Sequence, residues 1–254
     1  MNRMPAMVGT IDRRLLVNYR VEPEVLRGML PRPFRPQIVA GVGIAGICLI
    51  RLSGLRPIGT PAAVGITSEN AAHRVAVEWG GRDEPSRGVY IPRRDTKSRL
   101  TTLFGGRLFP GVHHRARFEV HEGEGKFEVA FTSVDRTAHV SVVAAVSRDL
   151  SSGSVFASLA EASAFFAEAP LGYSATHDPQ RFDGLELQCN RWAIEPLEVD
   201  RVESSFFEDG SIFPAGSCEF DSAFLMRDIA ATWRPRDAIG ATGSGTSIQA
   251  QRAG

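Results

Sequence analysis

The sequence predicts a mainly β (α+β) protein, an antiparallel barrel or sandwich with a few helices covering one end. Many short segments are rich in apolar residues or alternate between apolar and polar residues, as strands do. Few segments show helical spacing, and turn residues separate most of the strands. No linker rich in proline, glycine or serine divides the 254-residue chain before a small, polar C-terminal segment. These observations favour one domain followed by a tail.

In the first half of the chain, alternation and apolar runs predict strands over 13–21, 42–52, 68–81 and 88–92. Between the first two, residues 23–30 form an apolar stripe at helical spacing, and Pro23 suits the first turn of a helix. The glycines of 42–52 indicate bulges or close backbone contacts. Asp95 is a candidate N-cap for a helix over 96–104, which Gly105 and Gly106 would end.

In the second half, strands are predicted near 112–121, 126–134 and 137–147, with EGEG (122–125) as a hairpin turn. Residues 156–168 are the most helix-like segment, and Pro170 follows the expected end. The segments 185–199 and 216–233 are rich in strand residues. We expect the domain to cover residues 1–234 and a disordered tail to cover 235–254.

Composition narrows the classes of partner. Hydrophobic residues make up 43% of the chain, and 29 basic residues balance 29 acidic ones at a sequence pI near 7.0. This balance predicts no nucleic-acid or membrane partner. The basic residues are almost all arginine, because Lys97 and Lys126 are the only lysines. Imine chemistry requires a lysine, so this bias bears on mechanism.

The cysteines indicate a reducing compartment. Cys48, Cys189 and Cys218 are odd in number, far apart and outside any CxxC motif, which argues against a disulfide framework or a structural zinc site. The N-terminal residues lack the apolar core of a signal peptide, and the apolar run 42–50 is too short to span a bilayer. We therefore expect a cytoplasmic protein.

The stretch GGRLFPGVHHRARFEVHEGEG (105–125) contains adjacent histidines, His113 and His114. Side chains alternate along a strand, so His114 should share a face with Ala116 and Phe118, and His113 should lie on the opposite face. Two such histidines cannot converge on one metal. Either His113 faces solvent while His114 makes a hydrogen bond at the edge of the core, or one of them lines a cavity as an acid, a base or a donor.

Two further polar groups are candidates for a site. Arg93 and Arg94 follow a predicted strand and precede a predicted helix, where they could bind an anion or carboxylate. The alternative is that both are solvated. SENAAHR (68–74) brings together Glu69, Asn70 and His73, but this spacing matches no metal motif. No nucleophile elbow, phosphate-binding loop or dinucleotide motif occurs in a suitable context, so no cofactor and no metal are predicted.

Six segments carry a family pattern: LLVNYRVEPEVLRGMLPRPFRP, SENAAHRVAVEW, GVYIPRRDTKSRL, GGRLFPGVHHRARFEV, DGLELQCNRWAIEPLEV and SSFFEDGSIFPAGSCEFDSAFLMRDI. In this order, over roughly residues 10–234, they resemble an uncharacterised bacterial family related to acetoacetate decarboxylase. The resemblance implies a closed antiparallel β-barrel with peripheral helices and an internal pocket for a small organic molecule. It does not assign a reaction.

In acetoacetate decarboxylase, the first of two adjacent lysines forms an imine with the substrate ketone, and the second lowers its pKa. The resemblance places His113 and His114 nearest to this pair. A histidine cannot form the imine, and Lys97 and Lys126 lie elsewhere in the sequence. Schiff-base decarboxylation is therefore not expected.

The leading hypothesis is a lyase-like or isomerase-like enzyme that binds a small carboxylate or carbonyl compound inside the barrel. Arg93 and Arg94 would bind the anion, His113 or His114 would act as acid or base, and Glu69 would orient an imidazole. His73 completes the candidate residues for substrate binding. A non-catalytic ligand-binding or sensing protein using the same cavity is the alternative, and a structural domain that forms homo-oligomers is the third.

Overall fold

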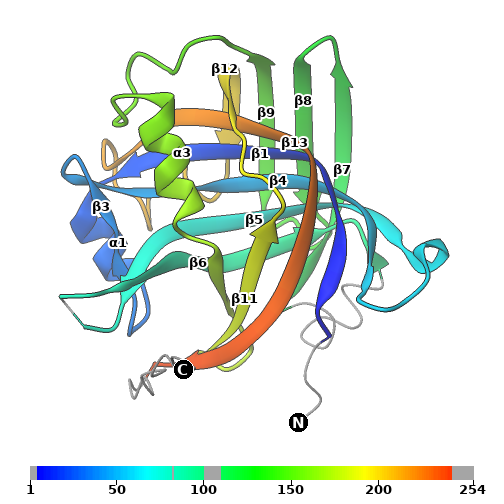
Figure 1. The fold of residues 1–254 in the computed structure, drawn as a ribbon. Coiled ribbons are helices and arrows are strands. Elements are labelled where there is room, and N and C mark those ends of the chain that lie inside the picture. Colours follow the sequence, from blue (N-terminus) through cyan, green and yellow to red (C-terminus); the bar gives the residue numbers. More distant parts are fainter. Residues whose placement is uncertain (1–4, 82, 100–109, 242–254) are drawn as a thin grey trace, which may run out of the picture.

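Long strands from both ends of the chain form the centre of the sheet. β1 (Met7–Val21) pairs antiparallel with β13 (Cys218–Gly240) on one side and with β4 (Val42–Pro57) on the other. β4 pairs in turn with β5 (Ile66–Trp79). The computed structural model in Figure 1 describes residues 5–81, 83–99 and 110–241.

The strand pairings branch at β6 (Ser86–Thr96), which pairs with β5 and also with β7 and β10. One branch runs through β10 (Leu171–Ala175) and β11 (Arg181–Cys189) back to β13. The other runs through β7 (His113–Gly123), β8 (Lys126–Ser133), β9 (His139–Val146) and β12 (Glu195–Ser204), again to β13. The short strands β2 (Arg35–Pro36) and β3 (Ile38–Val39) pair with β5 and β4.

The sheet is not wholly antiparallel, because β6 pairs in parallel with both β7 and β10. A parallel neighbour requires a crossover connection of about a dozen residues or more. Residues 97–112, between β6 and β7, meet that length. The expectation of an antiparallel sheet was wrong for these two pairings.

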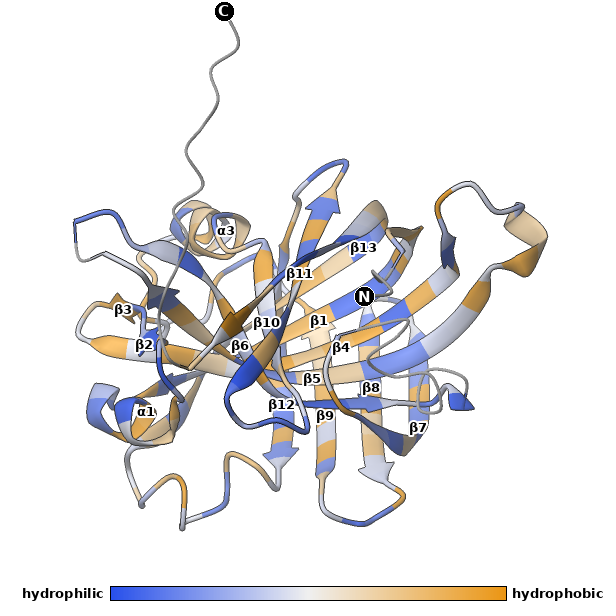
Figure 2. Cartoon of the chain, turned by 90° about the horizontal axis from the view of Figure 1, so that it is seen from below, coloured by the Kyte–Doolittle hydropathy of each residue, from blue (hydrophilic) through white to orange (hydrophobic). Residues whose placement is uncertain are grey.

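Both faces of the central strands are buried. Leu15 and Val17 belong to one hydrophobic core, which also contains Phe131 of β8, whereas Leu16 belongs to a second core with Phe166. Figure 1 shows α3 (Leu159–Ala167) in front of β1 and β4, with β8 and β9 behind them. Double-sided burial explains the continuous apolar run in 42–50. The peripheral strands β7 and β8 instead change between hydrophilic and hydrophobic positions along their length (Figure 2).

The helices confirm the predictions from spacing. α1 (Pro23–Met29) begins with Pro23 in its first turn and buries Leu26. α3 starts three residues later than expected, because the Ser158 side chain accepts a hydrogen bond from the backbone N–H of Glu161 and so caps the helix. A single 3₁₀ turn, η1 (Ala62–Val64), lies between β4 and β5.

The EGEG turn also forms as predicted. Glu124 and Gly125 have φ angles of 51° and 77°, and Gly123 pairs with Lys126 across the hairpin. Positive φ at both central residues is the geometry of a type I′ turn, which matches the twist of the flanking strands.

Two boundary expectations were wrong. Asp95 does not cap a helix: it lies in β6, and its carboxylate accepts hydrogen bonds from Arg93 Nε and Nη2 at 2.8 and 2.9 Å. The rest of the predicted helix, from residue 100 onward, lies outside the described residues. At the other end, β13 continues to Gly240, so residues 235–240 belong to the sheet through pairs such as Phe182 with Ile239. The remainder of the predicted tail, from residue 242, is not described.

Gly46 of β4 provides a test of the contact between the central strands. A Cβ at this position would overlap the carbonyl oxygen of Val17 in β1, which cannot move without breaking the pairing. We expect Gly46→Ala to lower the free energy of unfolding by about 2 kcal/mol or more in urea denaturation.

Gly28 of α1 is the matched control, because a Cβ there meets nothing within 4 Å. Gly28→Ala should raise the free energy of unfolding by about 0.5 to 1 kcal/mol through helix propensity. Equal effects of the two substitutions would contradict the close contact at Gly46.

Candidate functional site

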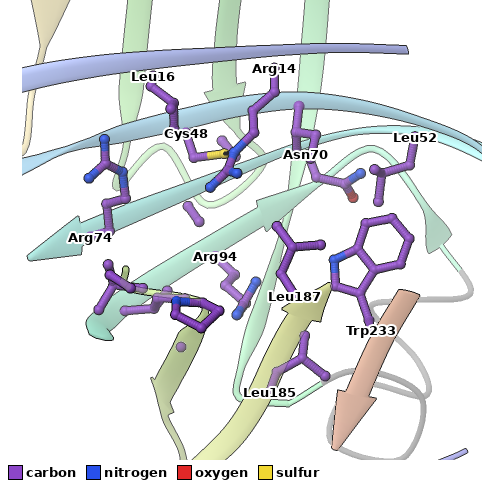
Figure 3. A pocket seen from close by; sticks show the side chains of 18 of the residues that line it. Arg14, Leu16, Cys48, Leu52, Asn70, Arg74, Arg94, Leu185, Leu187 and Trp233 are labelled. Carbon is purple, nitrogen blue, oxygen red and sulfur yellow. Dashed lines mark hydrogen bonds between the residues drawn. The ribbon is translucent and has the colours of Figure 1, made fainter. Parts of the chain in front are cut away.

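A cavity of about 310 Å³ lies on the face of the central strands that α3 and β11 cover. Its walls are mostly apolar. They include Leu16, Ile50, Leu52, Phe166, Leu185, Leu187, Trp192 and Trp233. Apolar walls with a few polar groups are typical of small-molecule sites. The polar groups include Ser68, Asp95 and His113. Figure 3 shows five others, Arg14, Cys48, Asn70, Arg74 and Arg94.

The strand register explains how these polar groups come together. Leu16 of β1 pairs with Cys48 of β4, Cys48 with Ala72 of β5, Ala72 with Arg94 of β6, and Arg94 with His113 of β7. Directly paired residues project to the same face of a sheet. One row of five adjacent strands therefore carries a thiol, a guanidinium and an imidazole into the cavity.

Two more arginines lie on neighbouring rows of the same face. Arg14 is two residues before Leu16, and Arg74 is two residues after Ala72, so the alternation of the strand directs both side chains toward the cavity. Figure 3 shows the Arg14, Arg74 and Arg94 side chains on this face of the sheet.

None of the three cavity arginines forms an ion pair within the described part of the chain. Arg14 Nε donates to Cys48 Sγ at 3.1 Å, Arg94 Nε donates to Ser174 Oγ at 2.9 Å, and Arg74 Nη2 donates to the Asn18 side-chain oxygen. Residues 1–4, 82, 100–109 and 242–254 contain no aspartate or glutamate, so they supply no side-chain carboxylate either.

The only carboxylate among the lining residues is already engaged. Asp95 is fully buried, and both of its oxygens accept hydrogen bonds from Arg93. Burial raises the pKa of Asp95, and the Arg93 hydrogen bonds oppose that shift. The cavity therefore has an excess of positive charge.

Burial also determines the protonation states around the cavity. It lowers the pKa of Arg74 and of Arg94 to about 10, which leaves both guanidinium groups charged at neutral pH. Burial, helped by the charge of Arg94, lowers the pKa of His113 to about 3, so its imidazole is neutral. A neutral imidazole offers both a donor and an acceptor nitrogen.

The structure places two of the predicted site residues, Arg94 and His113, at the cavity. Their neighbours Arg93 and His114 are not among its lining residues. Arg93 pairs with Asp95, and the His114 ring lies 3.0 Å from Asp135 with its side chain 34% exposed. The two histidines thus lie on opposite faces as expected, but His113 rather than His114 faces inward.

Glu69 and His73 lie on the opposite face of β5 from the cavity. Glu69 does not orient an imidazole: it accepts hydrogen bonds from Arg13 Nη2 at 2.5 Å and Arg51 Nε at 2.6 Å. His73 is fully buried against Phe206 and Phe207, at ring-centroid distances of 4.8 and 6.1 Å.

Sequence reasoning missed Arg14, Arg74 and Cys48. Each occupies an even-numbered position in a strand whose odd-numbered neighbours, such as Leu15, Val75 and Ile47, are fully buried. The available signal was an arginine followed directly by an apolar residue in a strand, as in Arg14–Leu15 and Arg74–Val75.

The other chemistry-bearing groups lie away from the cavity or form no cluster. Lys97 and Lys126 are exposed and are not among the lining residues. All three cysteines are free thiols. Within the described ranges, no three histidine, cysteine or acidic side chains gather where they could hold a metal ion. No helix in those ranges has the length and apolar character needed to cross a membrane.

Comparison with solved structures defines the class of fold. Acetoacetate decarboxylase from Legionella pneumophila is similar, with a TM-score of 0.59 and 10% identity over 93% of this chain and 86% of that one. An acetoacetate decarboxylase-like enzyme from Sphingomonas wittichii RW1 has a TM-score of 0.58 and 13% sequence identity, over 94% of this chain and 93% of that one. The enduracididine biosynthesis enzyme MppR, complexed with pyruvate, has a TM-score of 0.59 and 13% sequence identity, over 95% of this chain and 92% of that one. The chain therefore has an acetoacetate decarboxylase-like fold.

Within this class, the chain belongs to the DUF2071 family, described as an uncharacterized conserved protein, whose model matches residues 10–220. This confirms the resemblance found in the sequence. No curated protein matches the chain.

The burial of His73 generates a prediction about acid stability. Burial, followed by the charge of Arg93, lowers its pKa to about 3. The unfolded chain takes up a proton near the ordinary histidine pKa of about 6.5, whereas the folded chain does not. The free energy of unfolding should therefore fall as the pH drops from about 6.5 toward 3. By pH 4 this loss is on the order of 3 kcal/mol for His73 alone.

We expect His73→Phe to remove that part of the loss between pH 7 and pH 4, measured by urea denaturation at each pH. His177 is exposed and serves as the control, because His177→Phe should leave the slope unchanged. Identical slopes for wild type and His73→Phe would contradict a neutral, buried His73.

Proposed function

We propose that this protein binds a small organic carboxylate in the arginine-lined cavity, with the ring of strands acting as a closed barrel around it. The observation that carries the proposal is the set of three cavity arginines, Arg14, Arg74 and Arg94, without a carboxylate partner. Charges that are removed from water without a counter-charge are costly. A bound anion would offset that cost.

The size and walls of the cavity favour a small ligand with an apolar part. About 310 Å³ lies at the low end of the range for small-molecule sites. A solved structure of MppR, which shares the fold, is a complex with pyruvate. Pyruvate combines a carboxylate with a carbonyl group, which makes it a suitable first probe for this cavity.

His113 is the group we propose for acid–base chemistry. Burial first, and then the charge of Arg94, hold its pKa low. An anion bound at Arg94 would offset the second effect and raise the pKa of His113, which favours its use as a base. The protein would then be lyase-like or isomerase-like and would work without a Schiff-base lysine, since Lys97 and Lys126 are exposed.

A non-catalytic ligand-binding or sensing function remains the second candidate. Among the described residues that line the cavity, Asp95 alone is acidic, and it is already bound by Arg93. His113 would then be a neutral hydrogen-bond partner rather than a base. Both candidates require the same anion site and differ only in proton transfer.

Replacing Arg94 tests the anion site. We expect Arg94→Gln to weaken pyruvate binding, measured by isothermal titration calorimetry, by about tenfold to a hundredfold. This corresponds to the loss of one charge-assisted hydrogen bond of roughly 1.5 to 3 kcal/mol. Pyruvamide, which lacks the negative charge, should bind the wild-type protein correspondingly weakly.

Arg117 is the matched control, because it lies exposed on β7 and the same substitution removes the same charge. Arg117→Gln should leave the dissociation constant for pyruvate within about twofold of the wild-type value. If it weakens binding as much as Arg94→Gln, or if pyruvamide binds as tightly as pyruvate, the carboxylate site is wrong.

A second experiment separates catalysis from binding. If His113 acts as a base, it should promote exchange of the pyruvate methyl protons in D₂O, followed by proton NMR. His113→Gln should reduce the enzyme-dependent exchange by about a hundredfold or more, within the range for general acid–base groups. His114→Gln should leave it unchanged. Binding without any such exchange would favour the sensing function.

A further inference from the structure

Cys48 is a thiol that lines the cavity within hydrogen-bond distance of one of its arginines. Its side chain is nearly buried, with 7% exposed, and it shares the row of paired residues with Arg94 and His113. Figure 3 shows its sulfur against the guanidinium of Arg14. Anion binding by arginine and proton transfer by histidine do not require a thiol at this position.

Three arginines surround the Cys48 sulfur. Arg14 Nε donates a hydrogen bond to Sγ at 3.1 Å, and Arg74 and Arg94 both interact with the thiol electrostatically. Reactive thiols in proteins lie beside cationic side chains, whereas thiols buried in apolar surroundings are inert.

A second group at the same cavity points to a missing ligand. Arg74 is only 4% exposed, and its Nε has no hydrogen-bond partner among the described residues. A buried guanidinium N–H without an acceptor is costly. An anionic ligand beside Cys48 would supply one.

The other two cysteines provide an internal comparison. Burial raises the pKa of Cys189, although Arg14 opposes the shift, and Cys189 also lines the cavity. Burial raises the pKa of Cys218 to about 12, and Cys218 packs against the other core. Cys48 is thus the thiol with the most cationic surroundings.

The spacing of the row suits a small oxo acid. Adjacent strands lie about 5 Å apart, so the backbones at Cys48 and Arg94 are separated by roughly 10 Å. The small side chain of Ala72 lies between them. A carboxylate held by Arg94 would direct the adjacent carbonyl carbon toward the thiol.

We propose that Cys48 is a nucleophile that adds reversibly to the carbonyl carbon of an anionic 2-oxo acid held by the cavity arginines. This inference rests on the proposed function for its ligand. The Sγ–C bond forms as the C=O π bond breaks, its electron pair moves to the oxygen, and that oxygen takes up the thiol proton. The product is a thiohemiketal, and no oxidant or reductant is needed.

Competitive alkylation tests the reactivity of the thiol. The measured quantity is the ratio of the Cys48 alkylation rate with iodoacetate, an anionic reagent, to the rate with neutral iodoacetamide, followed by peptide mass spectrometry. We expect this ratio to be at least tenfold higher in the folded protein than in the urea-unfolded protein. Cys189 and Cys218 should react slowly with both reagents in the folded state. Arg14→Gln should reduce the preference for iodoacetate, whereas Arg117→Gln should not.

Carbon NMR with [2-¹³C]pyruvate tests the adduct. A protein-bound tetrahedral carbon should appear with wild type and disappear with Cys48→Ala, whose folding is checked by its thermal transition. The inference is overturned if Cys48 reacts no faster than Cys189, or if wild type and Cys48→Ala give the same spectrum.

These outcomes are distinct from failure of the proposed function. If pyruvate binding persists and depends on Arg94 while Cys48 is unreactive, only the nucleophile is wrong. If pyruvate does not bind at all, neither the carboxylate site nor the adduct exists, and iodoacetamide alone then reports whether Arg14 activates the thiol.

Discussion

The register of β1, β4, β5, β6 and β7 is the constraint on which the candidate site depends. It aligns residues far apart in the sequence, from Leu16 to His113, into one row across five strands. A shift of one residue in any pairing would turn that strand's polar side chain to the other face. The cavity therefore depends on backbone hydrogen bonds as much as on its own side chains.

Four pairs of adjacent residues show how the two faces divide the charge. In Arg13–Arg14, His73–Arg74, Arg93–Arg94 and His113–His114, one member lines the cavity and the other lies on the opposite face. The arginines on the opposite face are paired with carboxylates, as in the ion pairs of Arg13 with Glu69 and of Arg93 with Asp95. On the cavity face they are not. This contrast is what separates a structural charge network from a site prepared for an anion.

Much of the fold followed from local patterns. Pro23 and the apolar stripe of α1, the EGEG turn and the helix before Pro170 were predictable because each depends on residues close in sequence. The site was only half predictable. Alternation placed His113 and His114 on opposite faces but did not show which face lines the cavity. The sequence around Asp95 predicted a helix cap, whereas Asp95 is a buried strand residue bound by Arg93.

By itself, the sequence determined a mainly β chain of the DUF2071 family, with neighbouring residues on opposite faces of each strand. Only the tertiary structure decided that Arg14, Cys48, Arg74, Arg94 and His113 share one cavity while Glu69, His73, Arg93 and His114 do not. The physical reason is that alternation is local, whereas the identity of each face depends on which distant strands and helices cover it.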